Sequence, residues 1–203
     1  MIIFVRLSIL IVLWRLLIPC SPAAYAADRG VTMLAVGDIM LGRHIAKVMR
    51  TNGGDLPFHG IAPTLQSADI VFGNLEAVIA GDGSAPAFPE KPYSFHADKA
   101  AARSLGKAGF HLLGLANNHA LDYGPSALFE TRRLLREQGI VDFGAGKDII
   151  DARRPAVLSK NGVRFGVLGY GVAHSRAVYA KKDKTGIAPI IMEHIQKDIQ
   201  TLR

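Results

Sequence analysis

Short apolar runs alternate with amphipathic segments along the chain from residue 31 onward. The apolar runs predict β-strands, and they cover residues 31–36, 69–72, 110–116, 156–159 and 163–170. The amphipathic segments predict helices, and they cover residues 61–66, 98–108, 125–138 and 192–203, with one more beginning near Arg43. Strands that alternate with helices are typical of an α/β domain. The pattern therefore predicts one layered α/β domain.

Local signals mark the ends of several of these elements. Asp98 is placed to cap a helix, and Gly109 is placed to stop it. Asn161 and Gly162 separate two apolar runs, which is the strongest short-range signal for a β-hairpin. The segment 81–92 is rich in glycine, proline and small residues, so it predicts a surface loop.

The N-terminal residues 1–26 have the pattern of a secretory signal peptide. Arg6 precedes a short apolar stretch, and residues 24–26 form an A-x-A cleavage pattern. Arg15 interrupts the stretch, which is shorter than the roughly 20 apolar residues of a membrane span. The pattern predicts an exported, periplasmic or otherwise extracytoplasmic protein with a domain over residues 27–203. An uncleaved N-terminal anchor is the alternative.

Composition and charge exclude or disfavour several kinds of site. The 203 residues are 49% hydrophobic and 20% charged, with a formal net charge of +7, which suits a single globular domain. Cys20 is the only cysteine, so the domain lacks a disulfide and a zinc–thiolate site, and a lipid on Cys20 is disfavoured by Pro19. No aromatic residues alternate with basic clusters such as 132–133 and 153–154, which favours a solvated basic face over nucleic-acid binding. Such a face suits an anionic polymer or anionic lipid headgroups.

Polar side chains follow three of the predicted strands. Asp38 follows the first, Asn74 and Glu76 follow the second, and Asn118 and His119 follow the third. The carboxyl ends of neighbouring parallel strands lie on one edge of a sheet, so we expect these side chains to face one crevice. Oxygen and nitrogen donors of this kind suit one or two divalent ions, such as Mn²⁺, Fe²⁺ or Zn²⁺. A carboxylate between two ions would give a two-metal site for hydrolysis or group transfer.

Taken singly, most of these residues also have a structural interpretation. Asp38 could cap the helix that follows it. Glu76 could be a solvated loop carboxylate, and Asn117 and Asn118 could be turn residues.

His119 is the strongest single candidate for chemistry. Asp122, three residues further on, is placed to orient the imidazole ring. The sequence contains no G-x-S-x-G, Walker or G-x-G-x-x-G motif, so serine hydrolase, P-loop and Rossmann interpretations have no support.

Longer motifs surround the candidate residues. Residues 37–43 read G-D-I-M-L-G-R, residues 73–76 read G-N-L-E, and residues 116–124 read A-N-N-H-A-L-D-Y-G. Together with later segments up to residue 189, these motifs resemble the CapA family of capsule and poly-γ-glutamate synthesis proteins. The resemblance implies a calcineurin-like metallophosphatase fold, which is a four-layer α/β/β/α sandwich. This sequence is expected to hold the N-terminal part of that domain, without its C-terminal part.

The resemblance also implies roles for individual residues. Asp38 and Asn118 would be metal ligands, Glu76 would be the bridging carboxylate, and His119 would be the acid–base or phosphate-facing histidine. The supporting positions are Asn74, Asn117, Asp122 and Arg43. Met40 stands where the superfamily has a histidine, and the late histidine motifs of the superfamily do not occur here. Catalysis by these residues alone is therefore not expected.

The resemblance favours an exported cell-envelope protein for capsule or poly-γ-glutamate biosynthesis, with a metal-dependent phosphoesterase-like site. The expected partners are the anionic capsular polymer or its membrane synthase complex, with association at the membrane and no nucleic acid. One alternative is a non-catalytic assembly or export factor that binds the polymer or the synthase. Another alternative is a metal-dependent enzyme that modifies amides or peptides.

Overall fold

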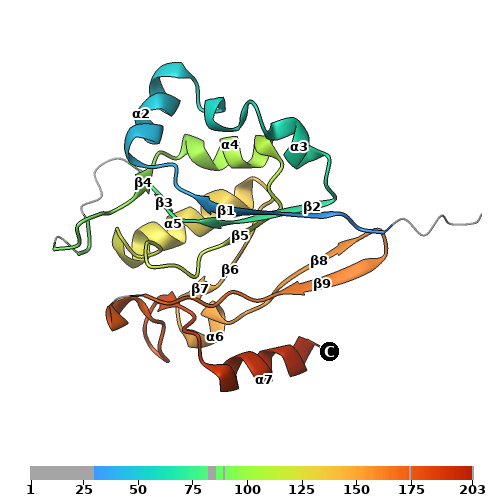
Figure 1. Cartoon of the computed structure of the whole chain (residues 1–203). Coiled ribbons are helices and arrows are strands. Elements are labelled where there is room, and N and C mark those ends of the chain that lie inside the picture. Colours follow the sequence, from blue (N-terminus) through green and yellow to red (C-terminus); the bar gives the residue numbers. More distant parts are fainter. Residues whose placement is uncertain (1–29, 82–85, 89, 174, 203) are drawn as a thin grey trace, which may run out of the picture. The chain divides into compact units, whose positions relative to one another are not determined.

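A parallel sheet forms the centre of the domain in the computed structural model (Figure 1). Its strand order is β1-β2-β5-β6, and each neighbouring pair is parallel. The strands are β1 (Met33–Ile39), β2 (Ile70–Leu75), β5 (Leu112–Gly114) and β6 (Val141–Phe143). Parallel neighbours need crossover connections, which helices provide here. The predicted α/β class is therefore confirmed.

The structure describes residues 30–81, 86–88, 90–173 and 175–202. The predicted signal peptide, residues 1–26, lies outside the described residues. The chain from Val31 to Arg203 forms one compact unit. No helix within the described ranges is both long enough and apolar enough to cross a bilayer.

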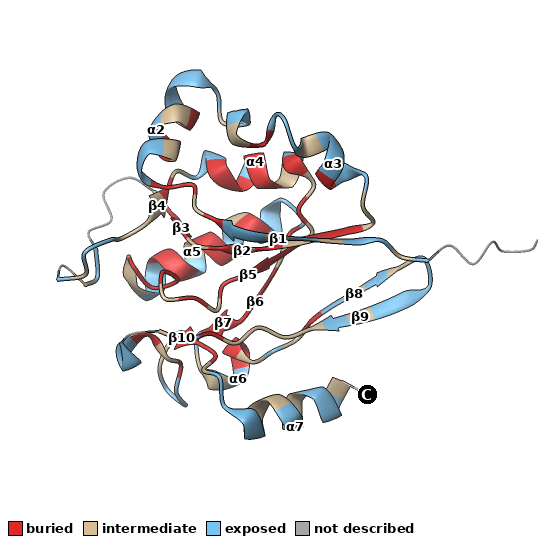
Figure 2. Cartoon of the chain, in the orientation of Figure 1, coloured by how far each residue is buried: buried red, intermediate tan, exposed pale blue. Residues whose placement is uncertain are grey.

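Helices cover one face of the central sheet. They are α2 (Arg43–Asn52), α3 (Ala62–Gln66), α4 (Ala100–Ala108) and α5 (Gly124–Glu137). Val71 and Leu113 of the sheet belong to the same buried cluster as Leu105 of α4 and Leu135 of α5. Figure 2 shows that α4 and α5 turn their buried residues toward the sheet. The main hydrophobic core therefore lies between the sheet and these helices.

A β-hairpin covers the other face of the sheet. It consists of β8 (Ala156–Lys160) and β9 (Val163–Val167), which pair antiparallel. Leu112 and Phe143 of the sheet pack against Ala156 and partly buried side chains of the hairpin.

The C-terminal helix α7 (Met192–Leu202) lies beyond the hairpin (Figure 1). A Cβ on Gly166 of β9 would come within 2.9 Å of the Leu202 side chain, so α7 packs closely on the hairpin. The order helix, sheet, hairpin, helix agrees with the expected α/β/β/α layering. The second β layer is represented by the hairpin in the described part of the chain.

Several short elements are not predicted by the sequence pattern. They are η1 (Leu56–Phe58), β3 (Val78–Ile79), β4 (His96–Ala97), β7 (Ala145–Gly146), α6 (Ile149–Ala152), η2 (Arg176–Val178) and β10 (Gly186–Ile187). β3 pairs with β4, and β7 pairs with β10. Elements of two to four residues are too short to show a hydrophobic period, so only the tertiary structure reveals them.

The predicted stop of α4 and the predicted hairpin turn are confirmed. Gly109 has a φ of 97° and ends α4, while Asn161 and Gly162 have φ values of 51° and 80° in the hairpin turn. The prediction that Asp98 caps α4 is wrong. The helix begins at Ala100 without a side-chain cap. Instead, the Asp98 carboxylate accepts a hydrogen bond from Arg50 Nη1 over 2.8 Å.

The prediction of a solvated basic cluster at residues 132–133 holds for only one of the two arginines. Arg132 is buried, and its guanidinium lies 2.6 Å from Asp142 and 2.7 Å from Asp151. Arg133 is exposed and pairs with Glu137 on the same helix. Of the two arginines, one fixes β6 and α6 against α5, and one reaches solvent.

Candidate functional site

The carboxyl ends of β1, β2 and β5 meet at one edge of the sheet. Asp38 of β1 is in register with Asn74 of β2, and Asn74 is in register with Gly114 of β5. The pairing of β1 with β2 shifts between Ala35 and Asp38, and such an irregularity re-aims the side chains that follow it. A Cβ on Gly73 would lie 2.7 Å from side chains of this irregular segment, so glycine permits the close approach.

A chain of hydrogen bonds runs along this edge. Asn74 Nδ2 donates to Asp38 Oδ1 over 2.8 Å, and Asn117 Nδ2 donates to Asn74 Oδ1 over 2.9 Å. Asn117 Nδ2 also donates to the Leu75 carbonyl over 2.9 Å, and Asn117 Oδ1 accepts from the His119 backbone N–H over 2.9 Å. Asn117 is buried and its side chain is fully engaged, so it connects the strand ends. Asp38 therefore lies at one end of this hydrogen-bonded chain and does not cap α2, whose N-cap is Gly42.

His119 and Asp122 form a buried pair behind this edge. His119 Nδ1 lies 2.7 Å from Asp122 Oδ2, and the two side chains are 8% and 1% exposed. A carboxylate at this distance favours the tautomer with the proton on Nδ1, so Nε2 keeps a lone pair. Phe95 stacks on the imidazole, with ring centroids 4.0 Å apart and an interplanar angle of 18°. The ring therefore has a fixed orientation with one nitrogen free to exchange a proton.

Lys91 also contacts this pair, and no sequence pattern singled it out. Its ammonium donates to Asp122 Oδ1 over 2.5 Å and to the Asn118 carbonyl over 2.9 Å. It also lies 3.1 Å from His119 Nδ1. The Phe95 backbone N–H donates to Asp122 Oδ2 over 2.8 Å. Lys91 stands in the segment predicted as a surface loop, where a lone lysine gives no signal of a buried contact.

Glu76 lies beside Asp38 and makes no hydrogen bond through its carboxylate to any described residue. Its backbone N–H donates to the Ile39 carbonyl over 3.0 Å, which places it next to the end of β1. Burial, and then repulsion from Asp38, raise the pKa of Glu76 above its ordinary value, while the charges of His119 and Lys91 oppose this. A cation between Glu76 and Asp38 would relieve that repulsion.

The donor set fits a divalent ion only if amide oxygens take part. Among the described residues, no group of three or more His, Cys, Asp and Glu side chains is placed to hold a metal. Asp38 and Glu76 supply two carboxylates, and the half-buried Asn118 has an amide that makes no hydrogen bond to the described residues. Such oxygen donors suit a hard cation.

Arg43 and Met40, both from the G-D-I-M-L-G-R motif, make contacts outside this hydrogen-bonded chain. Arg43 is exposed, and its guanidinium carbon lies 5.2 Å from the centroid of the Tyr93 ring. Met40, at the position of the superfamily histidine, accepts a hydrogen bond on its sulfur from the Gly42 N–H over 3.2 Å. The structure thus connects Asp38 and Asn117 through Asn74, and it places Arg43 on Tyr93.

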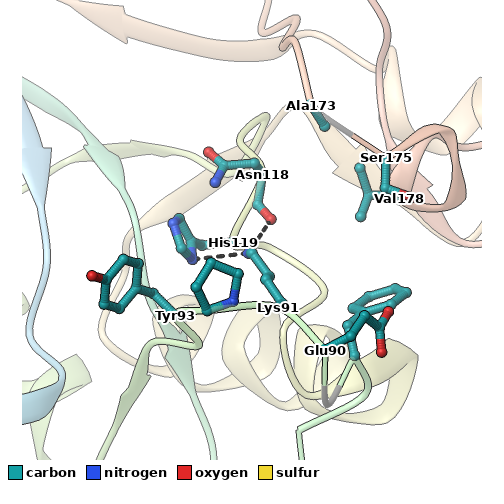
Figure 3. Close-up of a pocket in the computed structure, with 10 residues that line it drawn as sticks. Glu90, Lys91, Tyr93, Asn118, His119, Ala173, Ser175 and Val178 are labelled. Carbon is teal, nitrogen blue, oxygen red and sulfur yellow. Dashed lines mark hydrogen bonds between the residues drawn. The ribbon is translucent and has the colours of Figure 1, made fainter.

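A cavity of about 610 Å³ opens beside His119 (Figure 3). Glu90, Lys91 and Tyr93 line one side of it, and Ala173, Ser175 and Val178 face them from the C-terminal part of the domain. Phe88, Pro92, Asn118 and His119 complete the lining. A volume of this size accommodates a small organic ligand or part of a longer chain.

Comparison with known proteins identifies the family. Residues 32–203 match the family model described as "Bacterial capsule synthesis protein PGA_cap". The capsule biosynthesis protein CapA of Bacillus anthracis is 32% identical over 167 residues, which cover 82% of this chain and 41% of that protein. The PGA biosynthesis protein CapA of Bacillus subtilis is 32% identical over 155 residues, covering 76% of this chain and 40% of that protein.

A more distant relative carries a related name. A probable polyglutamine synthesis accessory protein of Mycobacterium tuberculosis is 28% identical over 206 residues, covering 83% of this chain and 53% of that protein. The chain spans about two fifths of the length of the two Bacillus relatives. The match to the family model covers most of the chain and includes all the strand ends described above. The chain therefore belongs to the bacterial capsule synthesis family PGA_cap, to which its A-N-N-H-A-L-D-Y-G motif pointed.

Proposed function

We propose that this protein acts in capsule or poly-γ-glutamate biosynthesis outside the cytoplasm, through a metal-dependent phosphoesterase-like site. The observation that carries the proposal is the meeting of Asp38, Glu76 and the His119–Asp122 pair at one sheet edge. The raised pKa of Glu76 beside Asp38 supports a role in binding a cation. The names of the Bacillus relatives support the pathway. The anionic polymer or its membrane synthase complex is the partner that follows from it.

In this proposal Asp38, Glu76 and Asn118 hold one or two divalent ions (Mn, Fe or Zn). A bound divalent ion would polarise an ester or amide oxygen and activate water for attack. His119 Nε2 would give or take the proton at the reacting centre. Asp122 would keep the other ring nitrogen protonated and stabilise the imidazolium form.

A non-catalytic assembly factor is the second candidate. It is favoured by the donor set, because in the described residues the site has two carboxylates and no group of three His, Cys, Asp and Glu residues. In that role the site would bind the polymer or the synthase complex without turning over a substrate.

Metal content separates the two functions. We expect the purified protein to contain a divalent metal by elemental analysis, and Glu76→Ala and Asp38→Ala to lose it while keeping a native circular dichroism spectrum. Asp183→Ala, at an exposed carboxylate in a distant turn, is the matched control and should retain the metal. A metal-free wild-type protein, prepared without chelator, would move the conclusion to the assembly factor. A metal-loaded protein should next be screened on phosphoesters and γ-linked amides.

Export has its own test. If the signal peptide is cleaved after residue 26, N-terminal sequencing of the protein from the cell envelope should begin at Ala27. Recovery of the intact N-terminus in the membrane fraction would support an anchor instead.

A further inference from the structure

Arg43 has a backbone conformation that its side chain does not favour. Its φ is 53°, and Asn161 is the other non-glycine residue with a positive φ in the described part of the chain. Asn161 occupies a hairpin turn, where such angles are required and asparagine tolerates them. Arg43 is the first residue of helix α2, where no turn requires a positive φ and where a long side chain disfavours it. Residues held in rare backbone conformations are concentrated at functional sites. The positive φ of Arg43 therefore indicates a functional role for its side chain.

The Arg43 guanidinium is held in place without being neutralised. It lies over the Tyr93 ring at 5.2 Å, and it makes no ion pair or hydrogen bond with any described residue. Other arginines of the domain, such as Arg132 and Arg153, are paired with aspartates. Stacking on an aromatic face leaves the N–H groups at the edge of a guanidinium free, and these groups match a carboxylate.

Tyr93 joins Arg43 to the cavity. Tyr93 lines the cavity together with His119, and its ring is the surface on which Arg43 rests. Lys91 does not supply a free positive charge there, because Asp122 and the Asn118 carbonyl already engage its ammonium. Arg43 does not itself line the cavity, but through Tyr93 it places a cation that no described carboxylate pairs with next to the cavity wall.

The wall of the cavity is mostly apolar. Phe88, Pro92, Ala173 and Val178 contribute aliphatic and aromatic surface. A ligand that packs against this apolar wall and also binds the Arg43 guanidinium needs an aliphatic stretch and a carboxylate. A γ-linked glutamate chain has this composition, with two methylene groups and one carboxylate in each unit.

We propose that Arg43, stacked on Tyr93, is a specificity-determining residue that binds a carboxylate of a chain whose aliphatic part lies in the cavity beside His119. This inference rests on the proposed function for the identity of the chain. It adds a binding subsite that is separate from the metal ligands.

Binding of a short γ-linked glutamate oligomer to the chelator-treated full chain tests the proposal by isothermal titration calorimetry. Loss of a charge-assisted hydrogen-bond pair reduces affinity by about 10-fold or more, which is the effect expected for Arg43→Ala. Arg43→Lys should recover part of the affinity, and Tyr93→Phe should keep it because the ring remains. Arg164→Ala, at an exposed arginine of β9, is the matched control and should bind like the wild type.

The ligand's chemistry is tested in parallel. The fully methyl-esterified oligomer should not bind, and inorganic phosphate at equal concentration should not displace the acid form. Phosphate that competes equally well would overturn the assignment of an aliphatic carboxylate.

Two further results would also overturn the inference. One is an Arg43→Ala protein that binds the oligomer as tightly as the wild type, and the other is a wild-type protein that does not bind it. Because binding is measured without metal, neither result depends on the metal site. The metal site is tested separately by elemental analysis. Arg43→Gly, which suits the backbone angle, serves as a folded variant if Arg43→Ala is unstable.

Discussion

The Asp122 carboxylate lies 2.7 Å from Nδ1 of His119, in a position that is 1% exposed. The same carboxylate accepts hydrogen bonds from Lys91 and from the Phe95 backbone N–H. One buried anion therefore fixes the imidazole ring, the lysine ammonium and the backbone that follows it. Removing this anion should affect both stability and the state of the ring.

We expect Asp122→Asn to lower the free energy of unfolding by about 1–3 kcal/mol, because the buried donors of His119 and Lys91 lose an anionic acceptor. Urea denaturation measures this loss. Nitrogen NMR of the histidine ring should show the Nδ1–H tautomer in the wild type and its loss in the variant. Equal stability of the two proteins would show that Asp122 does not hold this part of the fold.

Glu76→Gln should show how much the repulsion between Glu76 and Asp38 destabilises the folded protein. In chelator at neutral pH the variant should unfold at a higher temperature than the wild type, because the half-buried charge beside Asp38 is removed. A metal at 100 times its dissociation constant should stabilise the wild type by about 2.7 kcal/mol and the variant much less. Thermal unfolding with and without Mn²⁺ measures both effects. If the metal stabilises both proteins equally, Glu76 is not a ligand.

Arg43→Gly should separate stability from binding. The left-handed conformation costs a non-glycine residue about 1–2 kcal/mol, and the exposed contact with Tyr93 returns about 0.5–1 kcal/mol. The variant should therefore be as stable as the wild type, or more stable by up to about 1.5 kcal/mol, while losing affinity for the oligomer. Asn161→Gly, at the other non-glycine residue with positive φ, is the control and should not change binding. A clear loss of stability in Arg43→Gly would argue that the arginine is structural.

His111 should make stability depend on pH. Its Nδ1 accepts a hydrogen bond from the Val71 N–H over 3.1 Å, which requires the neutral ring. Burial, and then the charge of Lys160, lower the pKa of His111 from its ordinary value of 6.5. A lowered histidine pKa means that the folded state resists protonation, so stability is retained above pH 6.5 and falls as the pH drops below it.

His111→Leu is the corresponding variant. At neutral pH it should lose about 1–3 kcal/mol because the Val71 N–H is left unpaired. Its stability should then change less than that of the wild type between pH 7 and pH 5, as measured by urea denaturation. Identical pH profiles for the two proteins would contradict the assigned role.

Arg132 and Arg133 offer a matched pair of adjacent residues. Arg132→Met should cost up to about 3–5 kcal/mol, because Asp142 and Asp151 would lose their buried partner and keep only the exposed Arg136 and Arg154. Arg133→Ala removes an exposed pair with Glu137 and should change stability by less than about 1 kcal/mol. Chemical denaturation of both variants tests the difference, and similar losses would mean that burial of Arg132 is not decisive.

The α/β class, the hairpin and the grouping of polar residues at the strand ends could all be predicted from the amino-acid sequence. These features follow from local patterns, such as the Asn161-Gly162 turn and the apolar strand before Asn117. The resemblance placed the chain in its family because A-N-N-H-A-L-D-Y-G is a long and ordered motif. The spacing of His119 and Asp122 also indicated their contact, since three residues span one turn.

Which side chains neutralise one another became apparent from the folded chain. Lys91 reaches Asp122 across 31 positions, and Arg132 bridges Asp142 and Asp151, contacts that no local pattern encodes. The folded chain also shows that Asp98 pairs with Arg50 and does not cap α4. A charged residue finds its partner through the packing of distant elements, and the sequence pattern records only whether a position is polar. For the same reason the placement of Arg43 on Tyr93, and with it the proposed subsite, could be read only from the folded chain.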